Sequence, residues 1–296
     1  MPHILFAFLL ATLLYPAEGH LLPFRTLVLS VFIESVFIIR HRWGANKTAS
    51  RDVASVLFTF LFLWELLSDR LKCIDTMLFP APERIFTLFI SELPDMLSGL
   101  GGSLILLGSG YLSALATAVP FGLLVGWHKR LFNAVHPFAK VIGPIPPIVY
   151  IPYTIALLPS FRSASIFVIF AGAFFPLFVN TVNGVFSIPP ALLDAARMLH
   201  LKKRVFFFYV LLPGALPGIF TGASLALLLS FLLMTAAELI GSTSGIGWYI
   251  KNFSDFADYE RVIVGILFIS IIITLLTWLT ERLEKFLLRY REVNND

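Results

Sequence analysis

The sequence predicts an all-α polytopic membrane protein, and its composition and apolar runs are the main reasons. Hydrophobic residues make up 58% of the 296 residues and charged residues only 14%, and the mean hydropathy is +0.87. A helix needs about 20 apolar residues to cross the hydrocarbon of a bilayer. The period-2 alternation of a spanning strand is absent, and a spanning element must pair its backbone groups internally. Helices are therefore expected throughout.

Eight apolar runs predict eight spanning segments. The first is short, and the second contains Arg25 and Glu34 near its ends, where both side chains can reach the interface. We expect the first run to be an uncleaved segment, because no Lys or Arg precedes it and no convincing cleavage site follows it. The runs are 3–17, 21–39, 53–68, 101–127, 139–159, 163–186, 210–238 and 262–281.

The basic residues mark the orientation of these spans and do not form a nucleic-acid patch. The net charge of +4 comes from short clusters between apolar runs. With eight spans, all four main clusters fall on one side, which the positive-inside rule makes the cytoplasm. Both termini are therefore predicted to be cytoplasmic. The clusters are Arg40, Arg42, Lys47 and Arg51; Lys129 and Arg130; Arg197, Lys202, Lys203 and Arg204; and Arg282, Lys285, Arg289 and Arg291.

Prolines interrupt the predicted span 139–159. Gly143-Pro-Ile-Pro-Pro147 is followed by Pro152 and Pro159, and proline in a helix interior removes a hydrogen bond and clashes with the preceding turn. A regular helix is not expected here. The segment either faces a water-filled path or is a kinked structural helix. Cys73 is the only cysteine, which excludes an intrachain disulfide and a cysteine metal cluster. No metal ligand set is predicted.

A short amphipathic helix is predicted between the sixth and seventh spans, within 188–204. Pro189 and Pro190 precede a helix-forming run, as is typical of a helix start. One face carries an apolar stripe, with polar neighbours beside it. Such a helix could lie at the lipid interface or contact another protein. The stripe is Leu192, Ala195, Ala196 and Leu199, and the polar neighbours are Asp194, Arg197 and His200.

This segment resembles the signature loop of the permease subunits of ABC importers. The family pattern is EAA, three residues, Gly, nine residues, Ile, one residue and Leu-Pro. Asp194-Ala195-Ala196, His200 and Val210-x-Leu212-Pro213 keep that spacing, with Asp for Glu, Val for Ile and His200 for the Gly. The resemblance narrows to the branch that handles nitrate, sulfonates, taurine or bicarbonate. Further matching segments are Trp64-Glu-Leu-Leu67, Phe79-Pro-Ala-Pro82, Pro213 to Gly222, Ala237 to Gly241 and Ser244 to Tyr249.

The resemblance implies a type I ABC importer permease fold with six core spans in a domain at 53–292. Residues 1–52 would then be an added hairpin of two spans and a basic loop. It also implies a bacterial inner-membrane complex: a homodimer of this chain, two ABC ATPases and an extracytoplasmic solute-binding protein. The 192–200 helix would contact the ATPase through Leu192, Asp194, Ala195, Ala196, Arg197, Leu199 and His200.

No phosphate loop of the form G-x-x-x-x-G-K-[ST] occurs in the sequence. We therefore expect no catalytic residue and no cofactor in this chain, with ATP and Mg²⁺ bound by the partner ATPase. The solute would be small and anionic or organic, and the central spans offer it no Lys or Arg. Polar candidates for the path, which interhelical hydrogen bonding explains equally well, are Asn180, Thr181, Asn183, Ser230, Thr235 and Glu238.

Two other classes of function compete with this interpretation. An intramembrane serine protease would use Ser224, but no histidine lies in a span after it to act as base. An ion-coupled secondary transporter is the stronger alternative, since such proteins use broken helices and buried carboxylates. Its candidate ion sites are Glu34, Glu65 and Glu238, all near predicted span ends.

Overall fold

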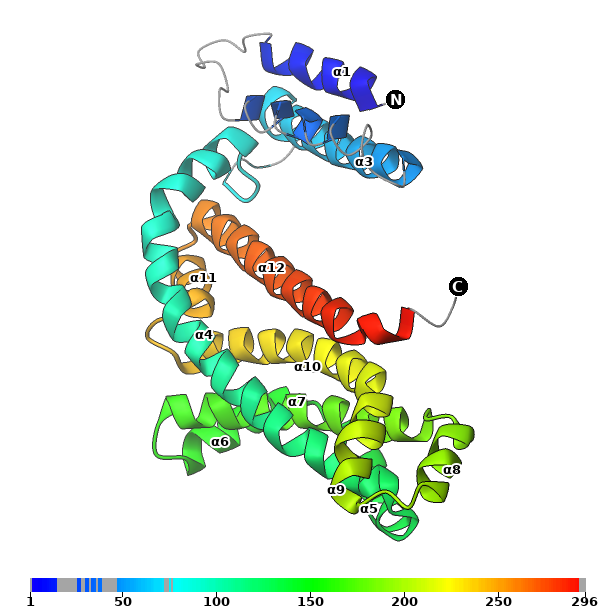
Figure 1. Ribbon diagram of the computed structural model, residues 1–296. Helices are drawn as coiled ribbons and strands as arrows, with labels where there is room; N and C mark the ends of the chain where they lie inside the picture. The colour runs from blue at the N-terminus through cyan, green and yellow to red at the C-terminus, as the bar shows by residue number, and fades with distance from the viewer. Residues whose placement is uncertain are drawn as a thin grey trace. The chain divides into compact units, whose positions relative to one another are not determined.

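The computed structural model describes residues 2–14, 26–27, 30–31, 33–35, 37–38, 47–71, 75 and 77–292. Over these residues every regular element is helical, so the predicted fold class is confirmed (Figure 1). The predicted span 21–39 lies largely outside the described residues. The elements are α1 (Pro2–Leu14), α3 (Lys47–Glu65), η1 (Leu66–Arg70), α4 (Pro82–Trp127), α5 (Lys129–Ile142), η2 (Pro147–Tyr150), α6 (Ile151–Leu157), α7 (Phe161–Phe186), α8 (Pro190–Met198), α9 (Lys203–Phe206), η3 (Phe207–Leu211), α10 (Leu212–Gly241), α11 (Ile246–Asp255) and α12 (Tyr259–Glu292).

Four described helices are long and apolar enough to cross a membrane. They correspond to four of the six predicted core spans, and one of them is a continuous helix formed by α9, η3 and α10. A π-helical turn, η3, lies inside that continuous helix, and such turns are frequent at functional sites. The four are Pro82–Trp127, Phe161–Phe186, Lys203–Gly241 and Tyr259–Leu288.

The other two predicted core spans differ from single apolar helices. The run 53–68 is the later part of α3 and the start of η1, and charged residues fill the first turns of α3. The run 139–159 is divided among the end of α5, the 3₁₀ turn η2 and the seven-residue α6, as its prolines predicted. In addition, α4 begins at Pro82, so much of the stretch between the predicted spans 53–68 and 101–127 is helical.

The chain divides into two compact units, Met1–Met96 with Tyr249–Phe268 and Leu97–Trp248 with Ile269–Asp296. In the first unit, Trp64 fixes the turn that precedes α4. Its indole Nε1 donates a hydrogen bond of 2.9 Å to the carbonyl of Pro80, and its ring packs on Phe79 with centroids 5.4 Å apart. The two short motifs around Trp64 and Phe79 therefore meet in space.

In the second unit, α7 and α10 lie side by side in extensive contact (Figure 1). Glycines allow their backbones to approach. A Cβ on Gly218 would lie 2.6 Å from the Asn180 carbonyl oxygen and from the Gly184 Cα, and one on Gly184 would lie 2.7 Å from the Ala215 carbonyl oxygen. Small residues at helix contacts permit such close packing in membranes, where apolar burial gives little drive to association.

Glycines of α4 contact the same core from another helix. A Cβ on Gly110 would lie 2.6 Å from Ile169, and one on Gly122 would lie 2.7 Å from Thr181. Leu177 and Phe178 of α7 are buried in the cluster that α4, α7 and α10 share. The three helices therefore form one packed body, and the loop between α7 and α10, which contains α8, leaves that body from two anchored ends.

We expect Gly218→Ala to destabilise the protein by roughly 1–3 kcal/mol, because the added methyl group must displace backbone and not a flexible side chain. The matched control is Gly102→Ala, where a Cβ meets nothing within 4 Å and where alanine should stabilise the helix by roughly 0.5–1 kcal/mol. Thermal unfolding of the two purified variants in detergent measures the difference. Equal midpoints would mean that the close approach of α7 and α10 is not required.

Candidate functional site

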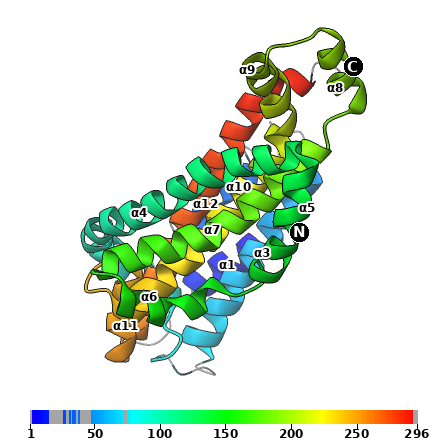
Figure 2. The ribbon, with the colours of Figure 1, turned by 90° about the horizontal axis from the view of Figure 1, so that it is seen from below.

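The predicted helix in the loop between α7 and α10 is present as α8. It begins at Pro190, where the missing N–H would have had no helical partner and the fixed φ already suits a helix. It is nine residues long and lies with α9 at one end of the second unit (Figure 2).

The apolar residues of α8 face in two directions. Ala196 is 5% exposed and Leu193 packs on the buried cluster that includes Ile188 and Leu211. By contrast, Leu192 is 47% exposed and Leu199 is 72% exposed. The apolar stripe predicted from the sequence is therefore only partly buried. One edge of the helix packs against the body of the protein, and the other edge is exposed. We call the exposed side the outer face; it consists of Leu192, Ala195, Met198 and Leu199.

Two of the predicted polar residues pair on the surface of α8. Arg197 donates from a guanidinium nitrogen to an Asp194 carboxylate oxygen at 2.9 Å, and both side chains are more than 60% exposed. An exposed pair at this spacing contributes less than about 1 kcal/mol. The ion pair holds the Arg197 guanidinium beside the helix.

His200 ends the helix in the conformation that glycine usually supplies. Its φ is 47°, in the left-handed region. The His200 N–H donates to the Arg197 carbonyl at 3.0 Å and the Leu201 N–H to the Ala196 carbonyl at 3.5 Å, which is the Schellman arrangement of a helix C-terminus. The ring Nδ1 lies 3.0 Å from the Met198 carbonyl oxygen. The substitution of His for the family Gly thus keeps the turn and adds backbone strain.

The predicted path residues do not converge in one place. Thr181 and Ser230 are fully buried, and their hydroxyls donate to the carbonyls of Leu177 and Ala226, four residues back in their own helices. Thr235 does the same toward Phe231. These hydrogen bonds satisfy the hydroxyls without any solute.

The two asparagine candidates for the path, both on α7, differ in burial. The Asn180 amide donates to the Pro176 carbonyl at 2.9 Å and its Cβ lies close to Gly222 of α10. Asn183 is exposed. Asn180 therefore belongs to the α7–α10 contact, whereas Asn183 is open to contact outside the described chain.

Glu238 is hydrogen-bonded within the protein, unlike the carboxylate of an open ion-binding site. It is fully buried at the end of α10. One carboxylate oxygen accepts from the Ser103 hydroxyl at 2.6 Å and the other from the Gly247 N–H at 2.7 Å, while the Ser103 hydroxyl accepts from the Ile246 N–H at 3.0 Å. A carboxylate at a helix N-terminus satisfies free N–H groups and complements the helix dipole. Glu238 and Ser103 together cap α11.

Gly245 makes that cap possible. Its φ is 108°, and a Cβ there would lie 2.4 Å from the Glu238 carboxylate. The two motifs that contain Glu238 and Gly245 thus both contribute to the cap of α11. Both motifs can be recognised in the sequence, but the role of Ser103 cannot. A serine in the middle of an apolar run does not indicate that its hydrogen-bond partner lies 135 residues away.

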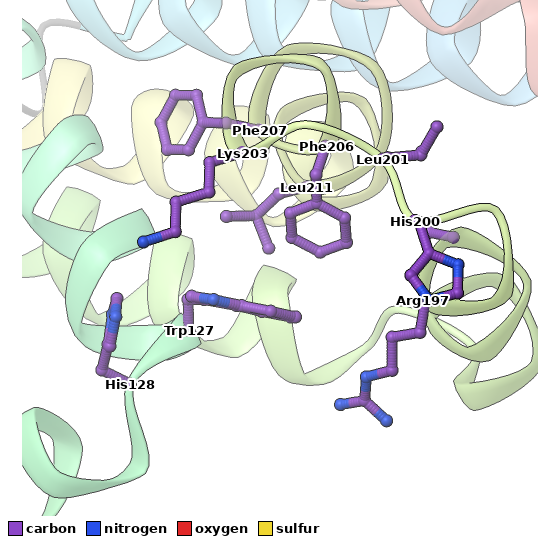
Figure 3. A pocket seen from close by; sticks show the side chains of 10 residues that line it. Trp127, His128, Arg197, His200, Leu201, Lys203, Phe206, Phe207 and Leu211 are labelled. Atoms are coloured by element: carbon purple, nitrogen blue, oxygen red, sulfur yellow. The ribbon is translucent and has the colours of Figure 1, made fainter.

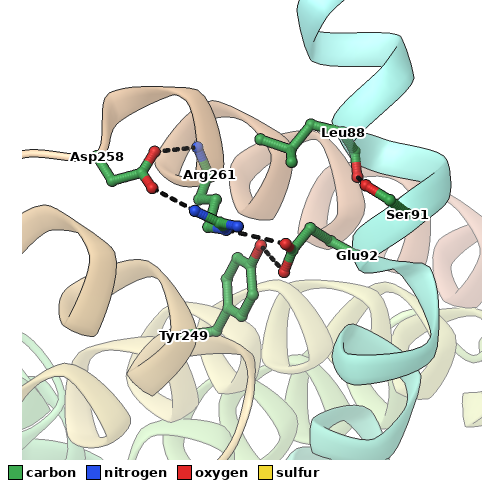
Figure 4. A network of polar contacts seen from close by, with 6 residues as sticks. All are labelled: Leu88, Ser91, Glu92, Tyr249, Asp258 and Arg261. Atoms are coloured by element: carbon green, nitrogen blue, oxygen red, sulfur yellow. Dashed lines mark hydrogen bonds and ion pairs between the residues drawn. The ribbon is translucent and has the colours of Figure 1, made fainter.

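A second polar cluster lies within the first unit, where α4, α11 and α12 meet (Figure 4). Arg261 donates to Glu92 at 2.9 Å and to Asp258 at 2.6 Å, and the Tyr249 hydroxyl donates to Glu92 at 3.1 Å. Burial, and then the neighbouring Glu92 carboxylate, raise the pKa of Tyr249. The phenol therefore stays protonated and acts as a donor, so the cluster is a fully paired support for α11.

Comparison with known proteins identifies the class of this chain. The family model described as the binding-protein-dependent transport system inner membrane component matches residues 118–289, which is more than half of the chain. The chain belongs to that family. It is therefore an ABC transporter permease, a multi-pass membrane protein, and the resemblance stated from its sequence motifs is confirmed.

Two relatives support this assignment. The chain is 35% identical over 163 residues to the nitrate import permease of Leptolyngbya laminosa, covering 55% of this chain and 58% of that protein. It is 31% identical over 182 residues to a protein of Bacillus subtilis named as an aliphatic sulfonates transport permease, covering 62% of this chain and 66% of that one. The chain thus spans somewhat less than two thirds of each relative.

The fold matches a chain of the MetNI methionine ABC transporter, solved in inward-facing conformations. The TM-score is 0.58 at 19% identity, over 67% of this chain and 98% of that chain. The expected type I importer permease fold is therefore confirmed.

We expect His200→Gly to stabilise the turn after α8 by roughly 0.5–1 kcal/mol. Glycine removes a left-handed strain of about 1–2 kcal/mol but adds backbone entropy to the unfolded state. His200→Val should instead destabilise the turn, because a β-branched residue tolerates positive φ poorly. Hydrogen exchange of the Leu201 amide should be slowest in the Gly variant and fastest in the Val variant. The reverse order would refute this description of the turn.

We expect Glu238→Gln to destabilise the permease by about 1–3 kcal/mol, since an amide cannot accept at both ends and leaves a buried donor unpaired. Glu281→Gln, at an exposed position of α12, is the control. The measurement is the thermal midpoint of each purified variant. If the two variants have the same thermal midpoint, the cap of α11 contributes nothing to stability.

Proposed function

We propose that this chain is the permease subunit of an ATP-driven ABC importer that moves a small anionic or organic solute into the cytoplasm. It would work by alternating access coupled to a separate ATPase. The family, the type I fold and the names of the relatives support the proposal.

The observation that carries the proposal is the outer face of α8. Leu192, Met198 and Leu199 are 47%, 80% and 72% exposed on a nine-residue helix between two candidate spans. Exposed apolar side chains gathered on one short helix mark a protein-binding surface, and a helix laid in a groove is a common form of recognition. We infer that the outer face inserts into the ATPase, as the sequence prediction proposed for this helix.

A movement of the ATPase would reach the rest of the permease through the inner side of α8. Ala196 and Leu193 pack against the chain itself, and the loop that carries α8 ends in α7 and α10. A shift of the ATPase would therefore act on these two helices together. Such coupling requires that the two ATPase states differ in their contacts with α8.

The proposed assembly contains two copies of this chain, two ABC ATPases and an extracytoplasmic solute-binding protein in a bacterial inner membrane. ATP and Mg²⁺ would be bound by the ATPase, since the sequence has no phosphate loop. With α8 contacting the ATPase, α8 and both termini would be cytoplasmic. This orientation agrees with the four basic clusters.

The solute is proposed to be of the nitrate or sulfonate class, from the names of the relatives. The buried hydroxyls proposed for the path are paired within their own helices, so any site in the spans would bind an anion weakly. Selectivity would then reside in the solute-binding protein.

The ion-coupled secondary transporter receives little support. Of its three candidate carboxylates, Glu238 has both oxygens hydrogen-bonded in the cap of α11, and Glu34 pairs with His3. The cap of α11 thus accounts for Glu238. No specific observation favours the transporter over the importer.

We expect Leu199→Ser to weaken association with the ATPase about 30-fold, because losing burial of one leucine at an interface costs about 2 kcal/mol. The control is Leu157→Ser on α6, where the side chain is 77% exposed. Co-purification of the ATPase and ATP-dependent uptake of labelled nitrate or sulfonate into proteoliposomes measure the effect. Normal ATPase binding and uptake by the Leu199 variant would exclude the proposed role of α8.

A further inference from the structure

A pocket of about 540 Å³ lies behind α8, between the end of α4, the C-terminus of α8 and the helical turns of α9 and η3 (Figure 3). Its volume is typical of ligand sites. The outer face of α8 does not line it. The pocket is therefore a separate concave surface, distinct from the side proposed to meet the ATPase.

The lining combines positive charge with aromatic rings. Arg197 and Lys203 supply the charge, His128 and His200 also line the pocket, and no Asp or Glu does. The rings of Trp127 and Phe206 meet with centroids 4.5 Å apart and form an apolar wall. This combination fits an anion that also carries an apolar part.

Lys203 is the cation most available to such a ligand. Among the described residues no carboxylate lies within ion-pair distance of it, whereas Arg197 is paired with Asp194. Figure 3 shows the Lys203 and His128 side chains directed to the same side of the pocket, beside Trp127. The Nδ1 of His128 lies 3.0 Å from the Leu124 carbonyl oxygen, which leaves Nε2 for other contacts.

Two candidate spans end beside the pocket. Trp127 is the last residue of one, and Lys203 is the first residue of another. Both residues line the pocket, so the pocket lies where apolar helix gives way to polar loop. Phosphate headgroups lie where spanning helices leave the hydrocarbon of a bilayer, and Trp is enriched there. Basic pockets at the membrane surface attract anionic lipids.

We propose that this pocket binds the phosphate headgroup of an anionic phospholipid, with Lys203 as the main cation and Trp127 and Phe206 against the glycerol and upper acyl chain. The lipid would occupy the space behind α8 and so support the helix from the side opposite its outer face. The ligand class follows from the lining of the pocket and from its place at the ends of two candidate spans. It does not depend on the proposed ATPase contact.

The test is binding of phosphatidylglycerol and phosphatidylcholine to the purified full-length permease in detergent, followed by native mass spectrometry without any ATPase. We expect phosphatidylglycerol to be retained in preference to phosphatidylcholine. Lys203→Gln should weaken phosphatidylglycerol binding about fivefold, the effect of one cation near a membrane surface. Lys203→Arg should bind normally, which would show that the variants are folded and that charge is what matters.

Lys202→Gln is the matched control, because Lys202 is an exposed neighbour that does not line the pocket. It should bind phosphatidylglycerol as the unmodified protein does. Equal losses in the Lys202 and Lys203 variants, or equal retention of the two lipids, would overturn the proposal. Titration with inorganic phosphate separates the two sources of the anion: Lys203-dependent binding of free phosphate without lipid binding would also overturn it. A failure of the ATPase contact would leave these results unchanged.

Discussion

The backbone contact between α7 and α10 is the constraint on which the second unit depends. Gly184 and Gly218 bring two main chains so close that a single added methyl group would overlap backbone atoms. In a membrane, helices gain little from burying apolar surface against each other, and close packing has to supply the stability instead. Because α8 is carried on the connection between these two helices, the same contact fixes both ends of the segment proposed to meet the ATPase.

The short helix itself is held by different means on its two sides. Ala196 seals the inner edge, and the Schellman turn at His200 satisfies the last carbonyls, so the outer face can remain apolar and exposed without a frayed end. The lipid proposed for the pocket behind the helix would provide a further point of support. A rigid helix with one sealed side and one open side can transmit displacement, whereas a loosely attached helix would absorb it.

The sequence predicted the helical class, four of the spans, the broken proline segment and the existence of α8, because hydropathy and proline act locally. It could not predict which apolar side of α8 would be buried. Ala195 and Ala196 are the same residue type, and they differ only because Ala196 contacts the body of the protein. Glu238 was predicted as a path residue, but its partners, Ser103 and the α11 backbone, come from distant parts of the chain. His200 differed from the family pattern in residue type and kept its backbone conformation.

The most direct test of the central claim is photo-cross-linking from the outer face of α8 in the assembled complex. A benzoylphenylalanine at Met198, which is 80% exposed, should cross-link to the co-expressed ATPase, with a yield that changes when ATP is bound. The same group at Tyr153 on α6, which is 74% exposed, should give no such product. Cross-linking from Tyr153 but not from Met198, in a complex that still transports, would contradict the assignment of α8 as the link to the ATPase.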